Sequence, residues 1–342
     1  MGRLLFWAVA LAGAAAIFLY FFFTSAISRP GPSAEDEAFM VERGASGAEI
    51  ARALQREGLI TDALLFRIAN RLHGSGQPLQ AGEYLIPARS SARQIVEMMT
   101  SGDALQHAIT FHEGITIAAV MKVLEESDVL SGDMPEAPPE GSILPETYHV
   151  QRGMTRAALL QQMREARDRV VAEVWENRQA NLPVNSAEEL VILASIVERE
   201  TGVPAERPLV AAVFVNRLRA PMRLESDPTI IYGVCRQFPD RCVDGRLVNA
   251  QGQRRTIRQS EIALNTGYNT YRIDRLPPTP ICNPGRAALE ATANPAQSNA
   301  LFFVADGTGG HVFASTLAEH NANVARWRQI EAQRLAEQRA AN

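Results

Sequence analysis

The segment LVILASIVERETG, residues 190–202, places carboxylates directly after a continuous apolar run. Seven of its first eight residues are apolar, and Glu198, Arg199 and Glu200 follow. At about 100° per residue the apolar side chains point in every direction, and a helix that is apolar all round is a buried helix. By angle, both glutamates fall among apolar positions. The segment therefore predicts a buried helix whose last turn carries two glutamates in apolar surroundings.

Carboxylates at this end of a helix need a physical reason. The carbonyl end of a helix repels negative charge, and carboxylates are rarely buried without a partner. Burial and the helix dipole both favour the protonated form, which raises the pKa. A carboxylic acid that keeps its proton near neutral pH can protonate a glycosidic oxygen. The alternative is a structural role in which the glutamates pair with buried arginines. Spacing alone does not choose between these readings, or between the two glutamates. The candidate partners are Arg207, Arg217 and Arg219.

Length and composition predict a globular protein with room for one large and one small domain. The chain has 342 residues, of which 46% are hydrophobic and 21% charged. A net charge of −4 gives no basic surface, so we expect no nucleic-acid partner. The three cysteines fit no tetrahedral zinc pattern, and no nucleotide-binding loop is present, so we expect no metal and no cofactor.

The N-terminus predicts a membrane anchor. Residues 4–23, LLFWAVALAGAAAIFLYFFF, carry no charge, and a helix of this length spans about 30 Å, the thickness of a bilayer core. Arg3 precedes the run and acidic residues follow it, which indicates a cytoplasmic N-terminus. The alternative is a cleaved signal peptide, but the run is longer than a typical signal core. In both cases the rest of the chain is extracytoplasmic.

The remaining pattern predicts an α+β fold. Four turns are followed by a Ser or Thr and then by apolar residues four apart, as expected where a hydroxyl caps an amphipathic helix. We interpret them as a common strand-turn-helix element rather than as true repeats. The turns are Gly44-Ala45-Ser46, Arg89-Ser90-Ser91, Gly114-Ile115-Thr116 and Gly153-Met154-Thr155.

The chain divides into five predicted regions. An anchor over residues 1–27 and a polar linker over 28–38 precede a small β-α-α-β unit with a trailing helix over 39–105. In that unit we expect a helix over 61–72, with Leu64, Leu65, Ile68 and Leu72 on one face, and a strand over 82–87. A larger α+β domain over 106–325 and a helical tail over 326–342 complete the chain. The larger domain has predicted helices over 116–127, 155–179, 187–201 and 205–219, and predicted strands over 301–304 and 311–313.

Several motifs in one order resemble the endolytic murein transglycosylase family, the YceG-like proteins. The motifs are EGSILPETYHV (140–150), IVERETG (196–202), VFVNRL (213–218), MRLESDPTIIYG (222–233), GYNTYRIDRLPPTPICNPG (267–285), ALEATANP (288–295) and FFVADGTGGHVFASTLAEHN (302–321). The resemblance implies that residues 39–105 are a LysM-like peptidoglycan-binding module and that residues 106–325 are the catalytic domain. It also implies a single-pass protein of the bacterial inner membrane whose catalytic domain is periplasmic.

The resemblance assigns the catalytic glutamate to Glu198 and leaves Glu200 a supporting role. It implies non-hydrolytic cleavage of the β-1,4 bond between N-acetylmuramic acid and N-acetylglucosamine, with 1,6-anhydromuramic ends, and termination of nascent glycan strands. Peptidoglycan synthases of the penicillin-binding class are expected partners. The expected sugar-binding residues are Glu140, Tyr148, Ser226, Asp227, Thr229, Tyr268 and Asn269. For 226–229 an ordinary helix cap, and for 268–271 a self-packed loop, are equally good explanations.

Two departures from the family pattern and a cysteine pair complete the predictions. Glu146 and Glu225 stand where the family commonly has Asp and Gln. Cys235 and Cys242 lie in an insertion, and because the compartment permits oxidation and the loop is short, we expect a disulfide between them and a buried free thiol at Cys282. A hydrolase acting on the same glycan, or a non-catalytic scaffold at the synthesis machinery, remain the alternative functions.

Overall fold

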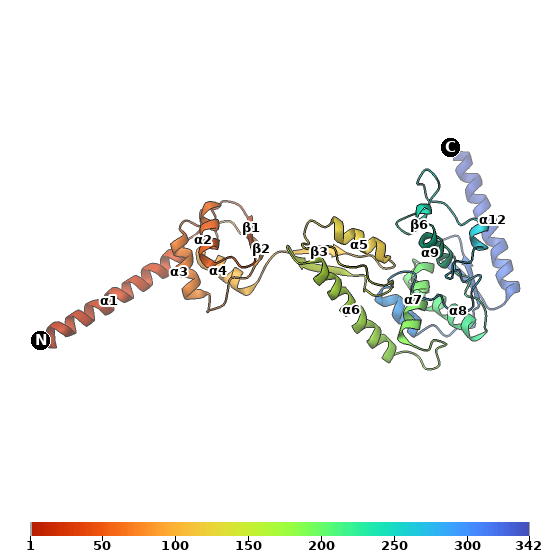
Figure 1. Cartoon of the computed structure of the whole chain (residues 1–342), viewed down its shortest axis with the longest axis horizontal. Coiled ribbons are helices and arrows are strands. Elements are labelled where there is room, and N and C mark those ends of the chain that lie inside the picture. The colour runs from red at the N-terminus through yellow and green to blue at the C-terminus, as the bar shows by residue number, and fades with distance from the viewer. Residues whose placement is uncertain (1, 342) are drawn as a thin grey trace. The chain divides into compact units, whose positions relative to one another are not determined.

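The chain is described by a computed structural model over residues 2–341 (Figure 1). It folds into two compact units. The first runs to Ala108 and includes Val129–Ser131 and His149–Met154; the second is formed by Ile109–Asp128, Gly132–Tyr148 and the chain from Thr155 onward. Helices and short two-stranded sheets occur in both, so the predicted mixed α+β class is confirmed.

The first unit begins with the apolar helix α1 and continues as β1-α2-α3-β2-α4. Within α1, Leu5–Ile27 is long and apolar enough to cross a membrane. The strands β1 and β2 pair antiparallel, with Phe39 opposite Tyr84, and both rings are buried. The predicted order of strands and helices is therefore confirmed. The elements are α1 (Gly2–Ile27), β1 (Glu37–Val41), α2 (Gly47–Arg56), α3 (Ala63–His73), β2 (Gly82–Ile86) and α4 (Ala92–Ser101).

Helix caps explain where these helices start. The Ser46 hydroxyl accepts a hydrogen bond from the N–H of Glu49, and the Glu49 carboxylate accepts one from the N–H of Ser46. Ser91 and Gln94 form the same reciprocal pair at α4. Each pair satisfies donors that a helix start leaves free.

The predicted apolar face of α3 is only partly right. Leu64 and Leu72 are 57% and 46% exposed, whereas Phe66 and Ala69 are buried. Leu65 and Ile68 are only partly buried. The helix has two apolar faces in sequence, and packing against α2 and α4 selects the one that carries the aromatic ring.

The second unit is organised around α7 (Ala187–Glu200). All eight residues from Leu190 to Val197 are buried, and α7 contacts α6, α8, α9 and α11. The prediction of a helix buried on every side is confirmed. The other elements are α5 (Ile117–Glu126), α6 (Arg156–Glu176), η1 (Pro204–Glu206), α8 (Arg207–Arg219), α9 (Asp227–Gln237), η2 (Pro239–Arg241), β5 (Cys242–Val243), β6 (Arg246–Leu247), α10 (Gln259–Ile262), α11 (Arg286–Ala293), β7 (Phe302–Ala305), β8 (His311–Ala314) and α12 (Leu317–Ala341).

The strand-turn-helix pattern predicted a strand before the turns at Gly114 and Gly153, and the structure has one before each. These strands, β3 (Gln106–Thr110) and β4 (Thr147–Gln151), pair with each other. Each has only five residues, several of them polar, so no periodic signal in the sequence indicated that the two strands pair. The short strands β5 and β6 were not predicted. The predicted strands over 301–304 and 311–313 are present as β7 and β8, which pair antiparallel, and α12 packs on both.

Candidate functional site

Glu198 occupies the last turn of α7, and its side chain is only 5% exposed. One carboxylate oxygen, Oε2, accepts a hydrogen bond from the backbone N–H of Gly285 at 3.0 Å. The other, Oε1, lies 3.5 Å from Nη2 of Arg207. The pKa of Glu198 is raised because burial disfavours the charged form; the Gly285 hydrogen bond and Arg207 oppose this effect. The geometry therefore holds a carboxyl group that is biased toward its protonated form.

Arg207 is shared between two carboxylates. Its Nη2 is 3.0 Å from Oε2 of Glu113, closer than to Glu198. Nε of Arg207 is buried and has no hydrogen-bond partner among the described residues. Glu113 packs directly against Gly285, where any Cβ would collide with its carboxylate. The arginine contact expected in a purely structural reading is thus present but long, and Glu113 is its better partner.

Glu200 points to a different neighbour. The hydroxyl of Ser226 donates a hydrogen bond of 2.5 Å to Oε1 of Glu200. Burial raises the pKa of Glu200 to about 7, and Asp227 adds to this, whereas the Ser226 hydrogen bond and Arg217 oppose it. Ser226 stands at the N-cap position of α9, but its side chain does not cap that helix. Arg219 contacts Asn216 and Asn181 rather than either glutamate.

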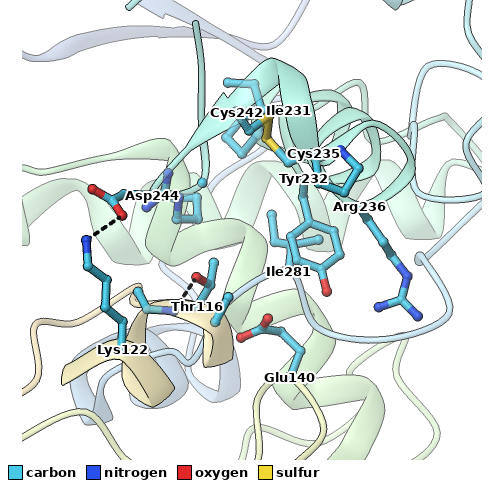
Figure 2. A pocket seen from close by; sticks show the side chains of 16 residues that line it. Thr116, Lys122, Glu140, Ile231, Tyr232, Cys235, Arg236, Cys242, Asp244 and Ile281 are labelled. Atoms are coloured by element: carbon cyan, nitrogen blue, oxygen red, sulfur yellow. Dashed lines mark hydrogen bonds and ion pairs between the residues drawn. A yellow bond between two sulfur atoms is a disulfide. The ribbon is translucent and has the colours of Figure 1, made fainter. Parts of the chain in front are cut away.

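Glu140 is a third buried carboxyl group and lines a cavity of about 390 Å³. Its Oε1 accepts hydrogen bonds from the N–H of Ile117 at 2.9 Å and from Nδ2 of Asn283 at 3.0 Å. Burial nevertheless raises the pKa of Glu140 to about 7. Figure 2 shows the hydroxyl of Tyr232 directed toward this carboxyl group, with the guanidinium of Arg236 beside the Tyr232 ring.

The segment from Cys282 to Gly285 connects Glu140 with Glu198. Asn283 binds Glu140 through its side chain, and the N–H of Gly285 binds Glu198. Cys282 is a buried free thiol whose pKa is raised by burial first and further by both glutamates. One short loop thus contacts both carboxyl groups.

Most of the other predicted sugar-binding residues have internal contacts. Tyr148 is buried, and its hydroxyl donates to the carbonyl of Leu144. Thr229 donates to the carbonyl of Ser226, and Asn269 donates to the carbonyls of Ile262 and Leu264. The Tyr268 hydroxyl lies 2.8 Å from Oγ1 of Thr279.

These contacts resemble those of a packed loop. Asp227 accepts a hydrogen bond from the Tyr271 hydroxyl, and Ser226 is engaged by Glu200. Their roles toward sugar therefore stay predictions, as does that of Glu140. His311 binds Glu206 through both its backbone N–H and its ring, as a structural histidine does.

Sequence reasoning missed several residues around the two carboxyl groups. Asn283 and Gly285 lie in a motif that carried the family resemblance, but nothing in their local sequence indicated which glutamate each would bind. Glu113 comes from the loop before α5, and Tyr232 and Arg236 both come from α9. Of these three residues, only Glu113 lies next to a predicted feature, because it directly precedes the predicted turn at Gly114.

Cys235 and Cys242 form a disulfide bond. Both cysteines line the Glu140 cavity, as do Asp244 and Gly245 from the β5–β6 hairpin. Opposite them, Lys122 of α5 lies 3.7 Å from Asp244. The disulfide thus fastens one wall of the cavity to α9 (Figure 2).

Comparison with known proteins agrees with these motifs. Two Streptococcus pneumoniae proteins, from serotype 2 strain D39 and from strain ATCC BAA-255/R6, are named endolytic murein transglycosylase. Each is 26% identical over 333 residues, covering 83% of this chain and 57% of the relative. The chain thus spans a little over half the length of these relatives. A Bacillus subtilis strain 168 protein of the same name is 25% identical over 317 residues, covering 82% of both chains.

Among solved structures, a crystal structure of a YceG-like protein from Listeria monocytogenes aligns with 84% of this chain and 98% of its own, with 24% identity and a TM-score of 0.48. The model of the YceG-like family matches residues 39–326, which is most of the sequence. The chain belongs to the YceG-like family.

Proposed function

We propose that the protein is an endolytic lytic transglycosylase of peptidoglycan. The observation that carries the proposal is the carboxyl group of Glu198, which is 5% exposed, has a raised pKa and is oriented by the N–H of Gly285. A protonated, oriented carboxyl group is what cleavage of a glycosidic bond requires. The names of the pneumococcal and Bacillus relatives support the same substrate.

In the proposed reaction Glu198 acts first as acid and then as base. Its carboxylic acid protonates the oxygen between N-acetylmuramic acid and N-acetylglucosamine, and the N-acetylglucosamine leaves with a free 4-hydroxyl. The resulting carboxylate accepts the proton of the muramyl 6-hydroxyl, whose oxygen closes onto C1. The product is a 1,6-anhydro end, and no water enters. Because the nucleophile belongs to the substrate, a second carboxylate is not needed to hold water.

The apolar helix α1 supports a proposal for the cellular location of the protein. A helix able to cross a membrane, joined to a domain that acts on peptidoglycan, fits a single-pass protein of the inner membrane with an extracytoplasmic catalytic domain. There the enzyme would meet nascent strands, and cleavage would terminate their growth. Penicillin-binding synthases are the expected neighbours. The LysM-like unit at 39–105 would hold the strand.

A hydrolase is the second candidate, and Glu113 is the observation that favours it. Glu113 shares Arg207 with Glu198 and raises the pKa of Glu198. A second carboxylate beside the acid could activate a water molecule, as in ordinary glycosidases. A non-catalytic scaffold is less well supported, because a scaffold has no need for a desolvated carboxyl group.

Mass spectrometry of digested peptidoglycan separates these functions. A transglycosylase gives muramic ends that are lighter by one water than reducing ends, and Glu113→Gln should retain these products. If the ends are reducing and Glu113→Gln abolishes their formation, the protein is a hydrolase. No cleavage by the wild-type protein would favour the scaffold.

A further inference from the structure

Two arginines that line the Glu140 cavity form no ion pair with a carboxylate of the described residues. Arg199 of α7 and Arg236 of α9 both line it. Arg199 reaches only the carbonyl of Gly114, at 3.4 Å, and Arg236 lies near Tyr232 and over the ring of Tyr268. Within residues 2–341 no carboxylate lies within 4.0 Å of either guanidinium. Both residues are exposed, so their guanidinium groups are accessible to an anion.

Glu140 offsets the charge of these arginines only in part. Burial raises the pKa of Glu140 to about 7, and Arg236 opposes this shift, so the carboxyl group carries less than a full negative charge near neutral pH. Lys122 adds a third cation, and its contact with Asp244 is long at 3.7 Å, with both side chains more than half exposed. Such an exposed pair is weak. Three cations, Lys122, Arg199 and Arg236, thus line the cavity together with two carboxyl groups, those of Glu140 and Asp244.

The size and position of the cavity fit part of a glycan. A volume of about 390 Å³ lies within the usual range of small-ligand sites, roughly 300–1,000 Å³. Arg199 lines the cavity, and Glu198, the preceding residue of α7, does not. The site is thus adjacent to the proposed acid without including it.

We propose that this cavity binds a carboxylate-bearing substituent of the glycan, with Arg199 and Arg236 as the anion-binding groups. The inference rests on the proposed function, because it takes peptidoglycan as the substrate. Two carboxylates of that polymer have the required chemistry. One is the lactyl carboxylate of an N-acetylmuramic unit without a peptide, and the other belongs to the stem peptide, whose attachment converts the lactyl group to an amide.

Binding can be tested without cleavage by using the full-length Glu198→Gln protein in detergent. The probes are chitotetraose, which has no carboxylate, a muramyl tetrasaccharide with free lactyl groups, and the same tetrasaccharide carrying stem peptides. Isothermal titration should show tighter binding of one carboxylated probe than of chitotetraose. The probe that is preferred identifies the lactyl or the peptide carboxylate as the ligand.

Charge-removing variants then test the assignment. Arg199→Gln or Arg236→Gln in the same background should each lower affinity for the preferred probe by about tenfold, as expected for one charged hydrogen bond, and leave chitotetraose binding within about twofold. Arg164→Gln, at an exposed position of α6 away from the cavity, is the matched control. Higher salt should weaken the preference.

Equal binding of all three probes, or a preference that survives both arginine variants, would overturn the anion site. That result is distinct from failure of the proposed function, which would appear as absence of cleavage by the wild-type protein.

Discussion

Three glutamates of the second unit have raised pKa values for one common reason. Glu140, Glu198 and Glu200 all lose hydration, and in each case burial outweighs the hydrogen bonds that favour the carboxylate. Their partners nevertheless differ: Asn283 for Glu140, the N–H of Gly285 for Glu198, and the Ser226 hydroxyl for Glu200. The three groups can therefore be separated by substitution.

Replacing Glu198 with a residue that cannot transfer a proton should abolish cleavage. Glu198→Gln keeps the shape of the side chain but cannot transfer a proton, so we expect cleavage of purified peptidoglycan to fall by at least about 10²–10⁴-fold. Glu200→Gln should cost less, because Glu200 binds Ser226 rather than the Gly285 loop. Near wild-type cleavage by Glu198→Gln, with a stronger defect in Glu140→Gln, would transfer the acid role to Glu140.

Glu200 should also make stability depend on pH. Its pKa is about 7 when folded and about 4.3 when unfolded. Between these values the folded state binds more protons, so stability is highest below pH 4 and falls as pH rises to about 7. The full difference is on the order of 4 kcal/mol. Denaturant unfolding of wild type and Glu200→Gln at several pH values should show this loss in the wild type only. If the free energy of unfolding changes with pH in the same way in both proteins, Glu200 is not buried as described.

At the scale of elements, one disulfide connects α9 to the segment that follows it. Cys235 lies in the last turn of α9, and Cys242 is the first residue of β5. The hairpin that follows, β5–β6, has only two paired residues on each strand and is not stable by itself. The cavity wall formed by Asp244 and Gly245 therefore depends on the bond to α9.

Thiol counting tests the bridge. Protein denatured without reductant should show one reactive thiol, from Cys282, whereas three thiols would mean that no bridge forms. Cys235→Ser with Cys242→Ser should reduce the free energy of unfolding by about 2–3 kcal/mol according to the chain-entropy model. The control is Cys282→Ser, which should remove the last thiol and leave the bridge intact.

At the scale of the whole molecule, the chain combines a candidate anchor with two compact units. Membrane attachment already confines an enzyme to a thin layer beside nascent glycan, so a second weak contact raises the effective concentration without high affinity. The alternative is that residues 39–104 only support the rest of the chain. The first compact unit also includes Val129–Ser131 and His149–Met154, which would lose partners in a deletion.

Deletion of residues 39–104 with the anchor retained distinguishes these roles. If the unit binds glycan, cleavage of long strands should fall and cleavage of short soluble oligosaccharides should change little. An equal loss on both substrates would show that the unit supports folding instead. Intact mass of the purified full-length protein should in addition retain residues 1–27, and their loss would identify a signal peptide.

The sequence by itself determined the elements whose signals are local. The all-round apolar run predicted the buried α7, and hydroxyl residues after tight turns predicted the starts of α2, α4, α5 and α6. These features depend on residues within one or two turns of each other, so they can be read without a fold. The order of motifs also identified the family.

Only the tertiary structure decided which face of α3 is buried, and that β3 and β4 pair across about forty residues. It likewise brought Gly285 to Glu198 and Asn283 to Glu140, over sequence separations of 87 and 143 residues. Such contacts depend on where distant segments pack, which no local pattern records. The carboxylates were visible in the sequence, but the partners that orient them and the cavity beside them come from packing alone.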